Sequence, residues 1–458
     1  MRTRNLLILA IAVVLVAGYI LLFERHQPTS EEAREQAERV LPGLDRDRVV
    51  AVDIDGEQGE VRLERSGDDW RIVRPLDFPA DATAVSSLLG SLENLDRDRV
   101  LPSEEVDPAE YGLDEPEVTV AVELEDGGEL RLQIGAEMPL GSNRALRAGG
   151  SGDVILAPGW FVTDLDRELD EWRSRDVVDL VSSDVASLEI GGRDGDTIEA
   201  VRVGDLWRLL EPVEDLAHRE HLRNLVSDLN ALRVTEFADG ADPGELGLDA
   251  PAWRITVVRA DGDEPVRLAL GETRPADTGE ATEVALRRGD DLFWVTDQGV
   301  LTRLTRAPVL WRSRSLYPLD TWSVDRLTLR SGEQAVALER AEGMWRTGEG
   351  DEVDGAAVHD RLTLLAEMEA IDYDLVLPDA EPTGRVEVVL TGEDERPVTF
   401  TFFPSLTADG KPLATVSGRD TVMSVDRTAV AELLADPHAL IVTEAPPEET
   451  GELPDEPE

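Results

Sequence analysis

The first feature of the hydrophobic pattern is an unbroken apolar run near the amino terminus. Residues 6–23 have the sequence LLILAIAVVLVAGYILLF, between MRTRN and ERHQPTS. As a helix this run extends about 27 Å, close to the roughly 30 Å hydrocarbon core of a bilayer. A cleavable signal peptide is the alternative, but its apolar part is shorter and a small-residue cleavage site should follow. The pattern predicts a transmembrane signal anchor at residues 6–23, with the arginines at positions 2 and 4 favouring a cytoplasmic amino terminus.

A helical pattern then occurs three times along the chain. In the first copy, apolar residues recur at offsets 0, 3, 4, 7 and 10, and Asp81 before them is a typical N-cap residue. The second copy has the same offsets, and the third keeps four of the five, with Arg361 at the remaining place. Each stripe must be buried against another element. The apolar positions are Val85, Leu88, Leu89, Leu92 and Leu95, then Leu222, Leu225, Val226, Leu229 and Leu232, then Val358, Leu362, Leu365 and Met368.

Short stretches in which apolar and polar residues alternate flank each helical pattern. VVAVDIDG, VASLEIGG and RLTLRSG each predict an opening strand, and VTVAVELEDGGELRLQIG and its two counterparts predict hairpins with glycine-containing turns. The predicted fold class is α+β. An N-terminal transmembrane helix precedes three tandem repeats, each a mostly antiparallel sheet of hairpins packed on one amphipathic helix.

Tryptophan and glycine positions support the repeat. Trp70 and Trp207 each stand five residues before a proline, and Trp345 has a similar setting without one. YGLDEP and LGLDAP are expected to be turns between the two halves of a repeat, because glycine supplies a positive φ and proline forces an extended exit. The structural repeat markers are Trp70, Trp207, Trp345, Gly112, Pro116, Gly247 and Pro251.

These patterns divide the chain into six parts. The predicted parts are a cytoplasmic tip and anchor (1–23), a polar stalk (24–46), repeat unit 1 (47–181), repeat unit 2 (182–320), a divergent repeat unit 3 (321–441) and a disordered acidic tail (442–458).

A tetrapeptide, WRSR, occurs near the ends of the first two repeats, beginning at Trp172 and at Trp311. Paired arginines beside a tryptophan in an acidic chain suggest a clamp between units through ion pairs and cation–π contacts. A binding hot spot is the alternative, because Trp and Arg are enriched there. Three further tryptophans lie off the repeated core positions and would suit an exposed platform. The candidate interface residues are Trp172, Arg173, Arg175, Trp311, Arg312, Arg314, Trp160, Trp253 and Trp294.

The charge of the chain excludes one class of partner. Ninety-seven acidic residues face 45 basic ones, which gives a formal net charge of −52. Such a surface repels phosphate, so we expect no nucleic-acid partner. The composition fits adaptation to a salty habitat, and capture of cations or of a basic partner is the alternative. The chain has no cysteine, which excludes disulfides, thiol nucleophiles and zinc–thiolate sites.

No motif in the sequence carries recognisable catalytic chemistry. His218 and His221 are three residues apart in AHREH, which lacks the HExxH spacing, and we interpret them as the start of a solvated helix. DIDGEQGE and GGRDGDTIE resemble calcium loops only in part. Carboxylates are so numerous that no pair can be singled out for glycoside hydrolysis. We therefore expect no catalytic residue, cofactor or metal.

The N-terminal apolar run, the W-x4-P motif, the amphipathic helix, YGLDEP and the hairpin ending LQIG together resemble domain-of-unknown-function family 4340. The resemblance covers residues 47–160 best and 183–300 nearly as well. It implies an accessory subunit associated with an ABC transporter, in the bacterial inner membrane with its bulk in the periplasm. The leading hypothesis is a non-enzymatic, membrane-anchored periplasmic scaffold whose partner is an ABC-transporter component. The alternatives are a module binding envelope glycan or cations, and a cryptic hydrolase.

Overall fold

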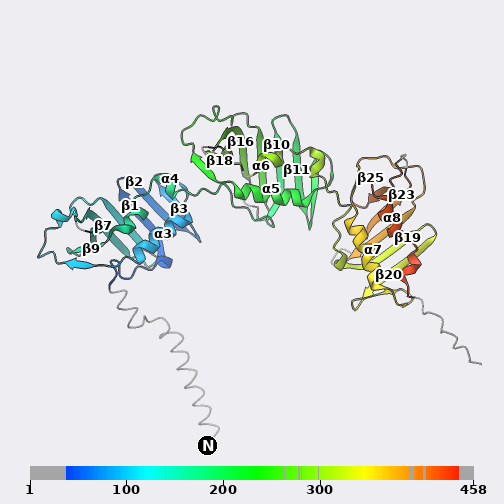
Figure 1. Ribbon diagram of the computed structural model, residues 1–458, viewed down its shortest axis with the longest axis horizontal. Coiled ribbons are helices and arrows are strands. Elements are labelled where there is room, and N and C mark those ends of the chain that lie inside the picture. The colour runs from blue at the N-terminus through cyan, green and yellow to red at the C-terminus, as the bar shows by residue number, and fades with distance from the viewer. Residues whose placement is uncertain are drawn as a thin grey trace, which may run out of the picture. The chain divides into compact units, whose positions relative to one another are not determined.

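The computed structural model describes residues 38–442 apart from positions 140, 263, 277–278, 280, 298, 392–396 and 406–408. The chain divides into two compact units, Met1–Arg175 and Asp176–Glu458, and each is described by itself. The elements keep the labels of Figure 1.

The first unit is built on one nine-stranded sheet with the order β4-β3-β2-β1-β6-β7-β8-β9-β5. All neighbouring strands are antiparallel. Its strands are β1 (Val49–Gly56), β2 (Gly59–Ser66), β3 (Asp69–Arg74), β4 (Phe78–Pro79), β5 (Arg99–Leu101), β6 (Val118–Leu124), β7 (Glu129–Glu137), β8 (Asn143–Ala148) and β9 (Val154–Pro158). Its helices and 3₁₀ turns are η2 (Arg46–Arg48), α3 (Ala82–Glu93), η3 (Pro108–Tyr111), η4 (Gly159–Asp164) and α4 (Leu169–Trp172).

The second unit contains two antiparallel sheets, a nine-stranded one and a seven-stranded one. The nine-stranded sheet has the order β13-β12-β11-β10-β15-β16-β17-β18-β14, which matches the first unit strand for strand. Its strands are β10 (Val185–Gly192), β11 (Thr197–Val203), β12 (Leu206–Glu211), β13 (Asp215–Leu216), β14 (Val234–Phe237), β15 (Trp253–Arg259), β16 (Val266–Pro275), β17 (Thr282–Arg288) and β18 (Asp291–Thr296), with α5 (Arg219–Ala231), α6 (Val300–Leu304) and η5 (Pro308–Trp311).

The seven-stranded sheet has the order β21-β20-β19-β22-β23-β24-β25. Its strands are β19 (Val324–Ser331), β20 (Gln334–Ala341), β21 (Met344–Thr347), β22 (Gly384–Leu390), β23 (Val398–Phe403), β24 (Leu413–Val416) and β25 (Met423–Ser424), with η6 (Thr321–Ser323), α7 (Gly355–Glu367), α8 (Arg427–Leu433) and η7 (Pro437–Leu440).

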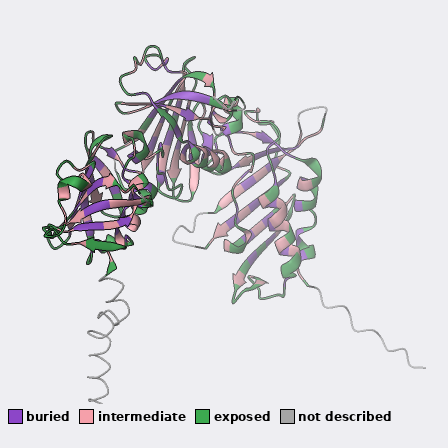
Figure 2. Ribbon diagram, turned by 60° about the vertical axis from the view of Figure 1, so that its left-hand side comes forward, coloured by how far each residue is buried: buried purple, intermediate pink, exposed green. Residues whose placement is uncertain are grey.

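Alternating burial explains why these segments form half-buried strands. In β6 every second residue is buried, beginning at Val118, so one face of the strand packs into the core. The three predicted helical stripes are also buried, and Val85, Leu225 and Val358 are each completely inaccessible to solvent. Figure 2 shows the buried residues concentrated in the sheets and on the inner sides of the helices.

The three tryptophan markers occupy corresponding places. Trp70 on β3, Trp207 on β12 and Trp345 on β21 each pair across the ladder with an arginine five residues earlier in the chain. Gly112 and Gly247 have φ values of 70° and 69°, the left-handed conformation that favours glycine.

The predicted packing of each sheet on one amphipathic helix is wrong, because the cover of each sheet is assembled from several short elements. The first core combines α3 with Phe161 of η4, Trp172 of α4 and Leu41 of the preceding segment. The core of the seven-stranded sheet likewise combines α7 with α8 and η7. In the second sheet, α5, α6 and η5 each contribute buried residues.

The predicted α+β class is therefore corrected to a mostly antiparallel β architecture. Strands such as β4, β5 and β25 contain only two or three residues. Alternation cannot be detected over so few positions, so the sequence underestimated how far the sheets extend.

The predicted transmembrane anchor and single-pass inner-membrane location are also corrected. The proposed span, residues 6–23, lies outside the described residues. In the described part of the chain, no helix is long and apolar enough to cross a membrane. The longest helices described there, α5 and α7, contain 13 residues each. They extend about 20 Å, well short of a roughly 30 Å hydrocarbon core.

Candidate functional site

A groove of about 940 Å³ lies in the second unit, between the start of α5 and the segment that follows α7. One wall carries the stacked rings of His218 and His221, and another carries the apolar residues of η5. Its lining residues are His218, His221, Val309, Leu310, Arg312, Arg314, Ala370, Ile371, Asp372, Tyr373, Asp374 and Leu375.

Aliphatic side chains of this groove are exposed to solvent. Val309 is 50% exposed, Leu310 is 47% exposed and Ile371 is 44% exposed. Two further exposed aliphatic residues, Val376 and Leu377, directly follow the lining segment. Contiguous exposed apolar surface on a folded protein marks an interaction site more often than isolated apolar residues do.

The histidine pair replaces a helix cap. Asp81 and Asp354 are the N-caps of α3 and α7, and both accept hydrogen bonds from backbone N–H groups of the first turn. The corresponding N-cap of α5 is His218, whose side chain makes no such bond. Instead its ring stacks on His221 with centroids 3.7 Å apart and planes 6° from parallel. The helix therefore begins with an aromatic wall facing the groove in place of a capping carboxylate.

Burial lowers the pKa of both histidines. The pKa of His218 and that of His221 lie below the ordinary value of 6.5, because desolvation disfavours the imidazolium form. Nδ1 of His221 lies 2.7 Å from the carbonyl oxygen of Leu310, which joins the histidine wall to η5. Both rings are thus predominantly neutral at pH 7, and both line the groove.

A buried ionic network forms the floor beneath the groove. Asp215 is completely inaccessible and accepts hydrogen bonds from Arg312 Nε at 2.8 Å and Arg419 Nε at 2.6 Å. The backbone N–H of Leu216 donates to the same carboxylate at 2.7 Å. Arg419 also donates to the carbonyl oxygen of Ser315 at 2.7 Å. Because the carboxylate and both guanidinium groups have partners, this buried charge is satisfied.

The network extends to the segment after α7 through Asp374. Arg312 donates Nη1 to Asp374 Oδ2 at 2.6 Å and Nη2 to Oδ1 at 3.1 Å. The hydrogen bond from Arg312 lowers the pKa of Asp374. Burial opposes the charged form of Arg312, but its bonds to Asp374 and Asp215 outweigh that and raise its pKa. The Arg312 guanidinium also lies 4.3 Å from the Tyr373 ring centroid. Arg312 therefore ties β13 to the segment after α7.

The two WRSR segments divide in the same way between buried and exposed residues. The tryptophan and first arginine of each are buried, with exposures of 1% for Trp172, 2% for Arg173, 1% for Trp311 and 3% for Arg312. Arg175 and Arg314, the last residue of each segment, are exposed. Within the two WRSR segments, the tryptophan and the first arginine are therefore hidden, and the last arginine is presented to solvent.

The three platform tryptophans do not form one surface. Trp160 is 53% exposed, whereas Trp253 and Trp294 are half-buried. Trp253 on β15 and Trp294 on β18 are separated in the sheet by β16 and β17. The guanidinium of Arg274 lies 4.0 Å from the Trp294 ring centroid. Of the three, Trp160 is the one classed as exposed to solvent.

Sequence reasoning missed Asp215, Asp374 and Arg419. Asp215 could have been noticed, because the apolar Phe78 stands at the matching place after the first repeat's tryptophan and proline. Arg419 gave no such signal, since it lies 204 residues from Asp215. Within the described residues, no group of three or more histidine, cysteine, aspartate or glutamate side chains could hold a metal ion.

The fold and groove define a sheet-rich protein with an apolar groove over a satisfied ionic floor. Residues 70–251 match the family described as Domain of unknown function (DUF4340). This match confirms the resemblance found in the sequence. Comparison with curated proteins gives no match, and neither does comparison with solved structures.

Proposed function

We propose that the protein is a non-enzymatic scaffold whose groove binds a segment of another protein, one that carries an apolar anchor flanked by basic residues. The observation that carries the proposal is the exposed aliphatic surface of Val309, Leu310 and Ile371 beside the neutral histidine wall. Its interior suits an apolar side chain, since burial of a leucine-sized group stabilises a complex by about 1.5–3 kcal/mol.

The charges in the groove floor favour an uncharged anchor. Arg312 and Arg419 balance Asp215 and Asp374, so the network has no net charge to offer a ligand. Arg314 is paired with Glu369 at 2.9 Å, and Lys411 with Asp372 at 3.2 Å. An ionic ligand would have to displace one of these partners.

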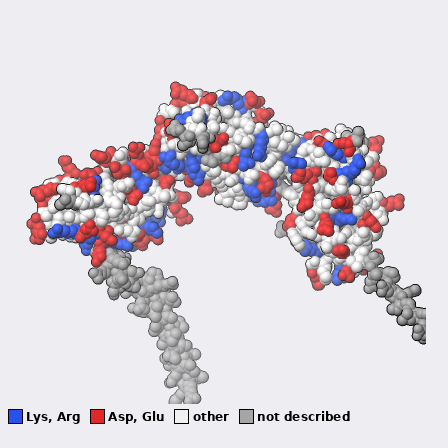
Figure 3. Space-filling model, viewed as in Figure 1, with Lys and Arg blue, Asp and Glu red and all other residues white. Residues whose placement is uncertain are grey.

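The charge of the whole chain favours basic residues on either side of the anchor. The formal net charge is −52 and the sequence contains a single lysine, Lys411. Acidic side chains are spread over the face shown in Figure 3. Such a surface attracts a basic segment and repels an acidic one, chiefly through the association rate. A transporter component, the partner implied by the resemblance, remains a proposal of the same kind.

Two labelled peptides test this function on the full chain. One carries a Leu-Leu-Trp anchor between lysine and arginine residues, and the other carries the same anchor between glutamates. Fluorescence anisotropy should detect binding of the basic peptide, and Leu310→Asp should weaken it tenfold or more, because the substitution places a charge on the apolar wall.

Val203→Asp is the matched control, since Val203 is a 56% exposed aliphatic residue of β11 outside the groove lining. It should leave the affinity for the basic peptide within twofold. The proposal is wrong if Leu310→Asp has no greater effect than the control, or if the glutamate peptide binds equally well.

A further inference from the structure

A second site lies in the first unit, where a rigid turn presents an exposed tryptophan. Trp160 is 53% exposed, whereas its neighbour Phe161 is completely buried. The two rings meet edge to face, with centroids 6.4 Å apart and planes 88° apart. Because Phe161 anchors η4 in the core, the exposure of Trp160 is a property of a fixed turn.

The backbone before the tryptophan also fixes its position. The N–H of Gly159 donates to the carbonyl oxygen of Ser142 at 2.7 Å. A Cβ atom at position 159 would stand 2.7 Å from that same oxygen, so only glycine fits without displacement of β8. The turn is therefore closed against the start of β8, and the indole is held at its outer surface.

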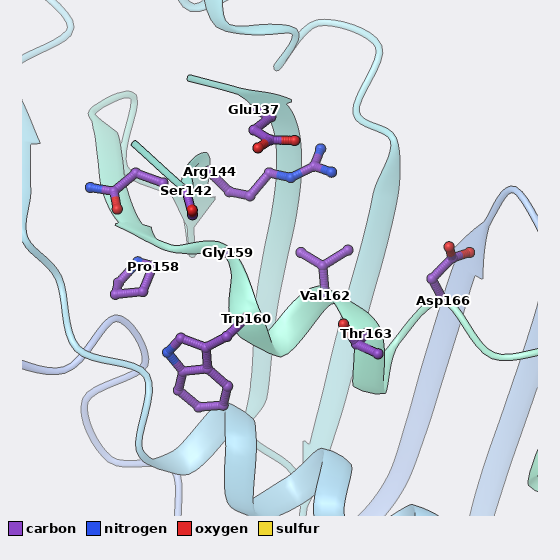
Figure 4. Close-up of a pocket in the computed structure, with 10 residues that line it drawn as sticks. Glu137, Ser142, Arg144, Pro158, Gly159, Trp160, Val162, Thr163 and Asp166 are labelled. Atoms are coloured by element: carbon purple, nitrogen blue, oxygen red, sulfur yellow. The ribbon is translucent and has the colours of Figure 1, made fainter. Parts of the chain in front are cut away.

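Beside Trp160 is a pocket of about 430 Å³ whose lining is mostly polar (Figure 4). Trp160 and Val162 supply apolar surface, and Glu137 lies across the pocket from Trp160 in the close-up. Ser142, Thr163 and Asp166 add two hydroxyl groups and a second carboxylate to the lining.

Among the described residues, the charged groups without a partner in this pocket are its two carboxylates. Arg144 is paired with Glu117 and also donates to the carbonyl oxygen of Gly135 at 3.3 Å. Asn143 donates to Asp98 at 2.8 Å. By contrast, the carboxylates of Glu137 and Asp166 have no hydrogen bond or ion pair with any other residue that the structure describes. A ligand here should therefore donate hydrogen bonds and should carry no negative charge.

We propose that this pocket binds a neutral saccharide, with one sugar face stacked on Trp160 and hydroxyl groups donating to Glu137 and Asp166. A sugar ring offers a flat face of C–H groups that packs on an indole, and its hydroxyls supply donors for the two carboxylates. The volume is sufficient for one or two sugar rings. This site is independent of the groove in the second unit, so either proposal can fail without the other.

The test uses the full chain, labelled with ¹⁵N, and follows the indole N–H signal of Trp160 in nuclear magnetic resonance spectra. The signal is assigned by its loss in Trp160→Phe. The probes are three disaccharides, N,N′-diacetylchitobiose, cellobiose and maltose. A fourth probe, Nα-acetyl-lysine methylamide, represents a basic side chain. At least one disaccharide should shift the signal with a Kd of about 1 mM or lower, which corresponds to a modest but specific affinity.

Trp160→Ala should weaken that binding tenfold or more, and Glu137→Gln severalfold, because each removes one part of the recognition. Trp322→Ala is the matched control: Trp322 is 70% exposed but does not line the pocket, so its loss should leave the affinity unchanged. Since Trp160 and Glu137 are both exposed, neither variant should impair folding, and the retained fold is checked from the remaining indole signals.

Two results would overturn the proposal. One is that none of the three disaccharides shifts the Trp160 signal. The other is that the lysine derivative binds while the disaccharides do not, which would make this a site for basic side chains.

Discussion

The ends of the two nine-stranded sheets are closed by the same backbone contacts but by different side-chain chemistry. In the first unit the N–H of Asp81 donates to the carbonyl oxygen of Trp172 at 2.8 Å, and in the second that of His218 donates to Trp311 at 2.7 Å. The arginine after each tryptophan is buried. In the first closure Arg173 lies 4.6 Å from the Phe78 ring centroid and donates to the exposed carboxylate of Asp170, whereas in the second Arg312 meets the buried carboxylate of Asp215.

The seven-stranded sheet supplies a third version, in which the arginine is absent. The N–H of Asp354 donates to the carbonyl oxygen of Leu440 at 2.9 Å, and Ile441 stands where the other closures have arginine. The backbone contact is thus compatible with an aromatic, an ionic or an aliphatic partner.

The comparison teaches that the ionic version contributes something other than closure. A buried ion network is seldom more stabilising than well-packed apolar residues of similar volume. The network around Asp215, however, reaches Arg419 and Asp374, which belong to the part of the second unit built around the seven-stranded sheet. We therefore interpret it as a device that fixes the floor and the walls of the groove in one arrangement.

The largest expected effect comes from removal of the shared carboxylate. Asp215→Ala leaves Arg312 and Arg419 buried without their common partner, and it should lower the free energy of unfolding of the second unit by about 3–5 kcal/mol. Urea denaturation of the full chain, followed by hydrogen exchange with mass spectrometry, separates the second unit from the first. Exchange in residues 176–442 should accelerate while that of the first unit stays unchanged.

Phe78→Leu is the control in the other closure. It keeps an apolar contact and removes the ring under Arg173, so it should cost only about 1 kcal/mol, and in the first unit alone. Equal costs for the two variants would contradict the distinction drawn between the ionic and aromatic closures.

The sequence predicted some features of these sheets and missed others. Helical stripes were predicted correctly, because burial of a regular face leaves a regular spacing; Leu88 and Leu229 are both completely buried. The exposed Trp160 was also among the candidate interface residues. The full ionic network could not be predicted, since 97 acidic residues make it hard to single out the completely buried Asp215, and its partner Arg419 is remote in sequence. The extent of the sheets was underestimated because β4 and β13 have two residues each.

The next largest expected change in stability concerns the N-cap residue of α5. His218→Asp should give α5 the cap that α3 and α7 possess, and it should raise the free energy of unfolding of the second unit by about 1 kcal/mol. The gain arises because an aspartate side chain can accept from N–H groups of the first turn, as Asp354 does from Ala356 and Ala357. Urea denaturation at pH 7.5, where the histidines are neutral, measures the change.

Asp354→Ala provides the reciprocal variant in α7. It removes an existing cap and should lower stability by about 1 kcal/mol. If His218→Asp destabilises the unit instead, the stacked pair with His221 contributes more than a cap would, and the histidine would then be a stabilising choice at this position.

The smallest expected change in stability is at Arg314, and it contrasts with the change at Arg312 in the same WRSR segment. Arg314 and its partner Glu369 have side chains 60% and 56% exposed, whereas the side chain of Arg312 is 4% exposed. Exposed ion pairs contribute about 0–1 kcal/mol because water and salt screen them. Arg314→Ala should therefore change the free energy of unfolding by less than about 0.5 kcal/mol, and that change should vanish in urea denaturation at 1 M sodium chloride.

Arg312→Ala should cost several times more at both salt concentrations, since it leaves Asp215 with one buried partner fewer. A large, salt-resistant loss in Arg314→Ala would mean that the last arginine of the segment, and not the buried one, controls how the groove is held together.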